Sequence, residues 1–281
     1  MITIRRWMRV WTALVVLSAS AVWASDIGHE IADQVSAASY QYFLDDVLYT
    51  HDGDDRGPTG PEHDLARDNI VATFESYGLD VELHAFAYQN GEWHNVVGTK
   101  VGFAYPDAQY IVGAHYDSVG NPGADDDASG VAGLLELARV FSQYDSEYTI
   151  RFIAFDLEER GLIGSKAYVA DHASDDIRGM IQLDMIAWDA GPYLTRIRGS
   201  TASDPPKYAL GDAVTEYGAG LRSRVVGRMD VSDHAPFEWA GIQACLMIET
   251  RHPDNPCYHR VCDSVDTPDY ISTESLADSG D

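Results

Sequence analysis

The chain has 281 residues, of which 45% are hydrophobic, so it is long enough to form one large α/β domain. Its formal net charge is -26 at pH 7, which makes nucleic acid and anionic membranes poor partners. This acidity is typical of a solvated surface that favours solubility and suits high salt; selection of cationic substrates is the alternative.

The N-terminus has the pattern of an export signal. Three arginines among the first nine residues precede an apolar stretch over 11–22, about half the ~20 residues that a membrane-spanning helix needs. Small side chains at Val22 and Ala24 predict cleavage after Ala24; a retained membrane anchor is the alternative. We therefore expect a signal peptide over 1–24 and a single domain over 25–281. The mature protein is predicted to be a periplasmic or secreted monomer without membrane contact.

Helical and strand patterns alternate along the rest of the chain. Helices are predicted over 35–48, 65–77, 129–141, near 165–170 and near 207–217, where apolar residues recur at helical spacing. Strands are predicted over 81–88 and 93–101, around an Asn-Gly turn, and over 110–114, 149–155, 180–185 and 244–248. This alternation predicts an α/β fold: a three-layer sandwich with a mostly parallel, mixed central sheet and helices on both faces.

Three consecutive aspartates, Asp125, Asp126 and Asp127, lie in the segment GADDDASG. They follow His115, which ends the apolar run YIVGAH. Carboxylates at contact distance oppose one another's ionisation, so such a cluster is costly to assemble unless a cation neutralises it. The run therefore predicts a metal site.

Further candidate ligands come from other segments. Glu158 and Glu159 follow the strand over 149–155, and Asp184 closes the strand over 180–185. Ligands in such sheets gather at the carboxyl ends of the strands, which is where these residues are expected. Each has an ordinary alternative: a solvated glutamate pair, a helix cap, or a surface histidine in the case of His259. Asp184 is harder to explain without a partner, because a buried unpaired carboxylate is strongly unfavourable.

The chain contains three cysteines, for which three pairings are possible. Cys245 lies in the apolar run QACLMIE and is predicted to be buried in a strand. In an oxidising compartment we therefore expect a disulfide between Cys257 and Cys262. It would hold His259, which lies between them.

Six segments, in order, resemble the motif set of one enzyme family: GAHYDS, PGADDDASG, FDLEERGLIGS, QLDM, SDHAPF and CYHRVCDS. The family is that of the secreted bacterial double-zinc aminopeptidases, the bacterial leucyl aminopeptidase group, related to glutamate carboxypeptidase and glutaminyl cyclase. The resemblance covers roughly 115–263 and implies a zinc-exopeptidase fold with two Zn²⁺ per chain. It implies that His115 and Asp184 bind one zinc ion, that Glu159 and His259 bind the other, and that Asp126 bridges both.

The resemblance also implies a mechanism. A metal-bridging hydroxide would attack the peptide carbonyl, with Glu158 as the general base that passes the proton to the leaving amine. Tyr258 would stabilise the oxyanion. Asp117 is expected to accept the second ring N–H of His115 and fix its orientation. His234, in SDHAPF, is expected to be structural or near the substrate pocket.

The expected activity is removal of N-terminal residues, apolar ones in particular, from peptides. The alternatives are a single-zinc, glutaminyl cyclase-like acyltransferase, a carboxypeptidase on the same metal core, and a non-catalytic binding domain that has lost its ligands. Two departures from the family pattern stand out. Val231 occupies a position where some relatives carry a substrate-placing arginine, with Arg228 nearby. The chain also stops at Asp281, before the longer closing helix usual in relatives, so we expect part of one sheet face to be less covered than usual, with coverage by a partner as the alternative.

Overall fold

The structure is a computed structural model that describes residues 21–188, 194–218, 220–250 and 254–271. Most of the predicted signal peptide, and the last ten residues of the chain, lie outside the described residues. Each helix in the described ranges is too short or too polar to cross a membrane.

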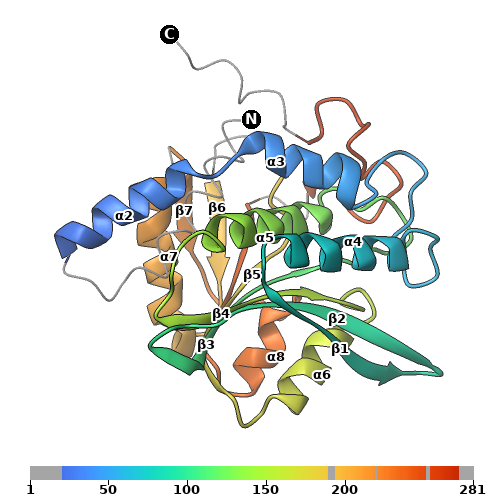
Figure 1. The fold of residues 1–281 in the computed structure, drawn as a ribbon. Helices are drawn as coiled ribbons and strands as arrows, with labels where there is room; N and C mark the ends of the chain where they lie inside the picture. The colour runs from blue at the N-terminus through green and yellow to red at the C-terminus, as the bar shows by residue number, and fades with distance from the viewer. Residues whose placement is uncertain (1–20, 189–193, 219, 251–253, 272–281) are drawn as a thin grey trace.

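A mixed sheet forms the centre of the molecule (Figure 1). Within the described ranges it has eight strands in the order β1-β2-β4-β3-β5-β8-β6-β7. The inner strands β4, β3, β5 and β8 are mutually parallel, whereas β1, β2 and β6 join through antiparallel pairings. The strands are β1 Asp80–Tyr88, β2 Gly91–Lys100, β3 Tyr105–His115, β4 Tyr148–Phe155, β5 Asp176–Leu183, β6 Leu194–Arg198, β7 Arg222–Val225 and β8 Ala244–Glu249.

Helices cover both faces of this sheet (Figure 1). The helical elements are α2 Ala21–Asp33, α3 Ala37–Tyr42, η2 Phe43–Val47, α4 His63–Ser76, α5 Ala128–Phe141, α6 Ile163–Asp171, η3 Thr201–Ser203, α7 Asp204–Tyr217 and α8 His234–Trp239. Helices α4 and α5 pack on one face, with α3 and η2 against them, and α6 and α8 pack on the other. The larger core lies under α5, whose side is lined by buried residues such as Val131, Leu134 and Leu135. The smaller core, around Phe155 and Phe237, lies under α6 and α8.

This arrangement confirms the predicted three-layer fold, and the predicted elements appear with shifted ends. The helix expected over 35–48 consists of α3 followed directly by the π-helix η2. Five elements were not predicted: α2, η3, β6, β7 and α8. The sequences of β6 and β7, LTRIR and RSRV, are short and carry two arginines each, so they lack the apolar signal of buried strands. Helix α8 is one and a half turns long and contains Pro236, which is tolerated only near a helix start.

The parallel strands position the site. Because β3, β4, β5 and β8 run in the same direction, the loops that follow them all leave the same edge of the sheet. Every side chain that the sequence singled out as a ligand lies in or next to one of these loops.

Candidate metal centre

Five segments bring the predicted ligands to the carboxyl edge of the sheet. His115 is the last residue of β3, and Asp126 lies in the loop between β3 and α5. Glu159 follows β4, Asp184 follows β5, and His259 lies in the loop after β8. Their ligand atoms form two groups that share Asp126, and within each group these atoms lie within 4.8 Å of one another.

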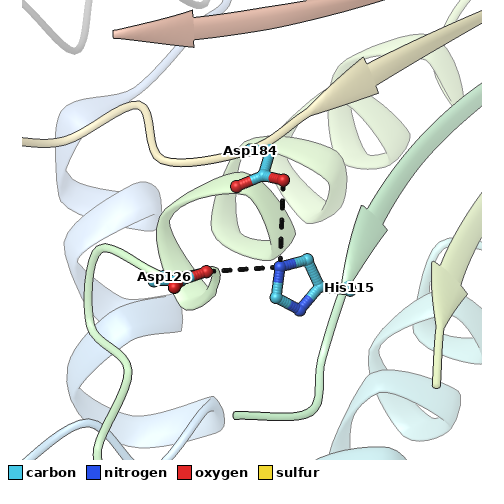
Figure 2. Close-up of side chains that lie close together, drawn as sticks. All are labelled: His115, Asp126 and Asp184. Atoms are coloured by element: carbon cyan, nitrogen blue, oxygen red, sulfur yellow. Dashed lines mark ion pairs between the residues drawn. The ribbon is translucent and has the colours of Figure 1, made fainter. Parts of the chain in front are cut away.

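The first group consists of His115, Asp126 and Asp184, and all three residues are buried (Figure 2). Nε2 of His115 lies 3.3 Å from Oδ1 of Asp126 and 4.0 Å from Oδ2 of Asp184. Figure 2 shows both carboxylates facing the same ring nitrogen. One imidazole nitrogen and two carboxylates is a donor set that suits a zinc ion.

The second group consists of Asp126, Glu159 and His259. Nε2 of His259 lies 3.1 Å from Oδ2 of Asp126 and 3.3 Å from Oε1 of Glu159. The two oxygens of Asp126 thus face two different histidines, which is the geometry of a bridging carboxylate. Unlike the first group, this one is partly open, because the His259 side chain is 38% exposed.

The three consecutive aspartates have different surroundings. Asp125 accepts hydrogen bonds from the backbone N–H groups of Ala187 and Trp188, at 2.9 and 3.0 Å. Asp127 caps α5 by accepting from the backbone N–H of Gly130 at 2.9 Å, and it also accepts from the backbone N–H of His115. Only the middle carboxylate, Asp126, lines the cavity. The outer two aspartates therefore anchor loops, whereas Asp126 is available to a ligand.

Asp117 contacts His115 through both its main chain and its side chain. Nδ1 of His115 lies 3.1 Å from the backbone carbonyl oxygen of Asp117 and 3.5 Å from its carboxylate. The carboxylate also accepts hydrogen bonds from the backbone N–H groups of Glu158 and Glu159, at 3.0 and 3.3 Å. Nδ1 of His115 therefore has both the main-chain carbonyl and the carboxylate of Asp117 within reach, and the same carboxylate also supports the main chain of the glutamate pair.

The two groups line a cavity of about 170 Å³. Its wall includes Glu158 and Tyr258, together with the apolar side chains of Met185, Met229, Val231 and Ile248. The ring of Tyr258 stacks on that of His259, with centroids 3.8 Å apart. His234, at the start of α8, is fully buried and does not line this cavity, which is consistent with a structural role.

Burial dominates the electrostatics of the acidic residues. It raises the pKa of Glu159 to about 7 and that of Asp184 to about 6, and nearby Asp126 adds to both shifts. Burial also raises the pKa of Glu158 well above its ordinary value, although His115 opposes this shift. For Asp126, contacts with His115 and His259 outweigh burial and hold the pKa below its ordinary value. The cluster thus concentrates more negative charge than its two histidines offset.

These observations fit divalent cations such as zinc. Oε1 of Glu159 is buried and makes no strict hydrogen bond with the described residues, although Nε2 of His259 lies 3.3 Å from it, so this oxygen is available to a metal ion. The chain also carries both imidazole and carboxylate donors on each side of Asp126, which zinc accepts readily.

The predicted disulfide between Cys257 and Cys262 is confirmed, and Cys245 is a buried free thiol in β8. The disulfide closes a short loop around His259, whose backbone has a φ of +57°. This left-handed conformation is unfavourable for a histidine, so the covalent closure helps to define where its ring points.

Two supporting residues had not been assigned a role from the sequence. Asp263 accepts hydrogen bonds from the backbone N–H groups of Asp125 and Asp126, at 2.7 and 3.1 Å. Arg56 is fully buried and donates to backbone carbonyls that include those of Tyr116 and Gly123. Asp263 ends the motif CYHRVCDS, which is a signal that could have been used. No comparable signal marks Arg56, since it lies in a polar loop distant in sequence.

A mixed sheet with two histidine-carboxylate groups at its carboxyl edge defines the class: an α/β protein of the zinc-exopeptidase fold. The sequence model of peptidase family M28 matches residues 95–280. The chain belongs to this family, as the motif resemblance predicted.

Two curated relatives share substantial sequence with the chain. Aminopeptidase YwaD of Bacillus subtilis (strain 168) is 35% identical over 215 residues, which cover 72% of this chain and 45% of the relative. A probable zinc metalloprotease of Pyrenophora tritici-repentis (strain Pt-1C-BFP) is 45% identical over 197 residues, which cover 55% of this chain and 45% of the relative. The chain thus spans just under half the length of these relatives.

Solved structures with the same fold include two different activities. An aminopeptidase from Aneurinibacillus sp. strain AM-1 matches with a TM-score of 0.73 at 22% identity, covering 88% of this chain and 92% of that one. A Porphyromonas gingivalis glutaminyl cyclase matches with a TM-score of 0.68 at 23% identity, covering 86% of this chain and 93% of that one. At these identities the likeness concerns the fold.

Proposed function

We propose that the protein is a zinc-dependent aminopeptidase that binds two zinc ions and removes apolar N-terminal residues from peptides. The observation that carries this proposal is the pair of ligand groups joined by Asp126 beside the buried carboxylate of Glu158. Membership in a peptidase family, and relatives named as an aminopeptidase and a zinc metalloprotease, support the reaction class.

The five ligands have distinct places in this proposal. His115 and Asp184 would hold one zinc ion, Glu159 and His259 would hold the other, and Asp126 belongs to both groups. Bound zinc would supply Lewis acidity and lower the pKa of a coordinated water to ~7.

Glu158 is the proposed general base. It lines the cavity, and burial keeps its pKa raised, so it can hold a proton between two steps of the reaction. Glu158 accepts the proton from the attacking water and delivers it to the amine nitrogen of the leaving peptide. The hydroxyl of Tyr258, whose side chain also lines the cavity, donates to the oxyanion that forms on the carbonyl.

The cavity itself supports the substrate assignment. A volume of about 170 Å³ admits one side chain, and the methionine, valine and isoleucine side chains in its wall favour an apolar one. Val231 belongs to this wall where some relatives carry an arginine, so apolar contact replaces a charge there. The confirmed disulfide supports the proposed location outside the cytoplasm.

A glutaminyl cyclase-like acyltransferase is the second candidate, favoured by the fold match to such an enzyme. It would need one zinc ion, whereas the group of Asp126, Glu159 and His259 offers ligands for a second.

One experiment separates these possibilities. Zinc is counted per chain in the same purified sample that is assayed on free and N-blocked peptides and on peptides with N-terminal glutamine. Two zinc ions and cleavage of free amino termini alone are expected. A single zinc ion with cyclisation of glutamine would favour the cyclase, and release of C-terminal residues would favour a carboxypeptidase.

A further inference from the structure

A buried ion pair lies behind the wall of the cavity. His63 is the first residue of α4, and its Nε2 lies 2.9 Å from Oδ1 of Asp156, just after β4. The exposed fractions of the two residues are 3% and 0%. Neither side chain lines the cavity, so the pair is not part of the ligand groups.

Asp156 controls the backbone that leads to the glutamate pair. Its Oδ1 accepts a hydrogen bond from the backbone N–H of Leu157 at 2.8 Å. Leu157 has a φ of +55°, a left-handed conformation that is unfavourable for a residue with a β-carbon. The next two backbone N–H groups, those of Glu158 and Glu159, both bind Asp117. Two buried carboxylates therefore hold three consecutive amides of a turn.

Asp156 depends on His63 for its place in this turn. Its second carboxylate oxygen is buried and has no hydrogen-bond donor among the described residues. Burial raises the pKa of Asp156, and the contact with His63 opposes that shift. Without the imidazole, the carboxylate would keep the backbone donor of Leu157 and the Tyr116 hydroxyl, which also donates to the carbonyl of His94 at 3.0 Å.

The ring of His63 is itself fixed in orientation. It packs edge-on against Trp93, with ring centroids 5.5 Å apart, and at an interplanar angle of 40° against Tyr116, with centroids 5.1 Å apart. Asp156 is held from the other side, since its backbone N–H donates to Oδ1 of Asn95 at 2.9 Å. The pair thus links α4, β2 and the end of β4 rigidly.

We propose that His63 and Asp156 are positioning residues, which hold Leu157 in its left-handed conformation and thereby aim Glu158 and Glu159 into the cavity. This inference rests on the proposed function for the role of Glu158, but its effect on Glu159 concerns zinc binding alone.

The test compares two substitutions of one residue. His63→Phe keeps an aromatic ring against Trp93 and Tyr116 but has no donor for Asp156, whereas His63→Gln restores an N–H donor at similar reach. Asn69→Ala is the matched control, because it removes a hydrogen bond from the same helix to the carbonyl of Val47, remote from the turn. For each full-length variant, Tm, zinc affinity by competition with a chelator, kcat and KM are measured.

For His63→Phe we expect about a tenfold or larger fall in kcat and in affinity for one of two zinc ions, with KM within about twofold. His63→Gln should recover most of both, and Asn69→Ala should change neither. A purely structural pair would lower the Tm of His63→Phe while leaving kcat and zinc affinity at the level of Asn69→Ala, and this result would overturn the proposal. If the wild-type protein released no amino acid from any peptide, the proposed function would fail, and the zinc measurement would still decide the role of the pair.

Discussion

The carboxylate of Asp117 accepts a hydrogen bond from the backbone N–H of Glu158 at 3.0 Å. The same carboxylate accepts from the next amide along the chain, so it supports the main chain of the glutamate pair. Asp117 therefore acts on the proposed base through the backbone, and its side chain is fully buried with no access to substrate.

Replacing the carboxylate of Asp117 should lower activity without removing the zinc ions. Asparagine at position 117 keeps one oxygen but places an N–H₂ group against a backbone N–H, so one of the two hydrogen bonds is lost. We expect kcat/KM of Asp117→Asn to fall by about 10 to 100-fold, measured by steady-state kinetics on zinc-loaded protein. Asp107→Asn, on an exposed part of β3, is the control for loss of one negative charge. Equal rates for the two variants would contradict the supporting role.

The proposed role of Glu158 as general base can be tested with a substitution that removes only its ability to accept a proton. Glu158→Gln preserves the shape of the side chain, and Glu158 is not among the proposed ligands. We expect zinc content to stay unchanged while kcat falls at least ~100-fold, the usual contribution of a general acid-base group. Glu82→Gln, on the exposed strand β1, should have normal kinetics. Near-normal turnover in Glu158→Gln would exclude the assigned role.

The proposed bridging role of Asp126 predicts that its substitution changes the number of zinc ions bound per chain. Asp126→Asn removes the negative charge that the two ligand groups share. Its amide nitrogen cannot bind a metal, so only one oxygen remains as a ligand. We expect the zinc content to drop from two per chain to one or none, measured by elemental analysis after gel filtration. Asp125→Asn should lower Tm with a smaller effect on zinc content, because Asp125 binds the backbone of Ala187 and Trp188. Two zinc ions in Asp126→Asn would refute the bridge.

Stability should depend on pH in opposite ways with and without zinc. In chelator, burial raises the pKa of Glu159 to about 7 and that of Asp184 to about 6, while contacts with Asp126 and Glu159 raise the pKa of His259 to about 10. All three bind protons more tightly in the folded state than in the unfolded chain, where the values are ~4.3, ~3.9 and ~6.5. Their contribution to the free energy of unfolding is therefore present at low pH and is lost as pH rises through the folded-state values.

We accordingly expect the Tm of the metal-free protein to fall between pH 5 and pH 8. Zinc binding requires deprotonated ligands, so saturating zinc should raise Tm most at the upper end of this range. Differential scanning fluorimetry in chelator and in zinc checks both trends. A metal-free Tm that climbs across the range would show that burial does not control these groups.

The disulfide should affect both stability and the more open ligand group. Removing it by Cys257→Ser with Cys262→Ser should lower the free energy of unfolding by about 2 kcal/mol, the low end expected for a short loop. It should also weaken binding of the zinc ion held by His259 more than that of the other. Denaturant unfolding and chelator competition measure these effects. Cys245→Ala, a buried thiol outside the site, should leave zinc affinity unchanged.

Local sequence patterns were sufficient to predict the strands whose ends carry the site residues. Apolar strand patterns placed His115 and Asp184 at strand ends, and the strand-end rule then predicted their convergence. Which of the three aspartates faces the cavity could not be decided from spacing, since adjacent residues in a loop have no fixed period. The resemblance to a family singled out Asp126, and the structure shows it alone of the three in the cavity wall.

Contacts across long sequence distances were beyond such reasoning. His63 and Asp156 are separated by 93 positions, and a polar loop before one helix gives no sign of a partner beyond another strand. Asp117 was correctly placed near His115, but its carboxylate also accepts from the amides of Glu158 and Glu159, which lie 41 and 42 positions away and give no local signal of this contact. The missed strands β6 and β7 are stabilised by pairing within the sheet, which overrides their weak local preference.

Asp125 and Asp127 bind backbone amides, whereas Asp126, between them, faces the cavity. This segment is therefore sensitive to a shift of one position along the chain. Inserting or deleting a single residue before the run would exchange the cavity-facing oxygen of Asp126 for one that a backbone amide requires, although the composition of the loop would hardly change. Point substitutions here would be graded in their effects, whereas a one-residue length change should abolish the centre outright.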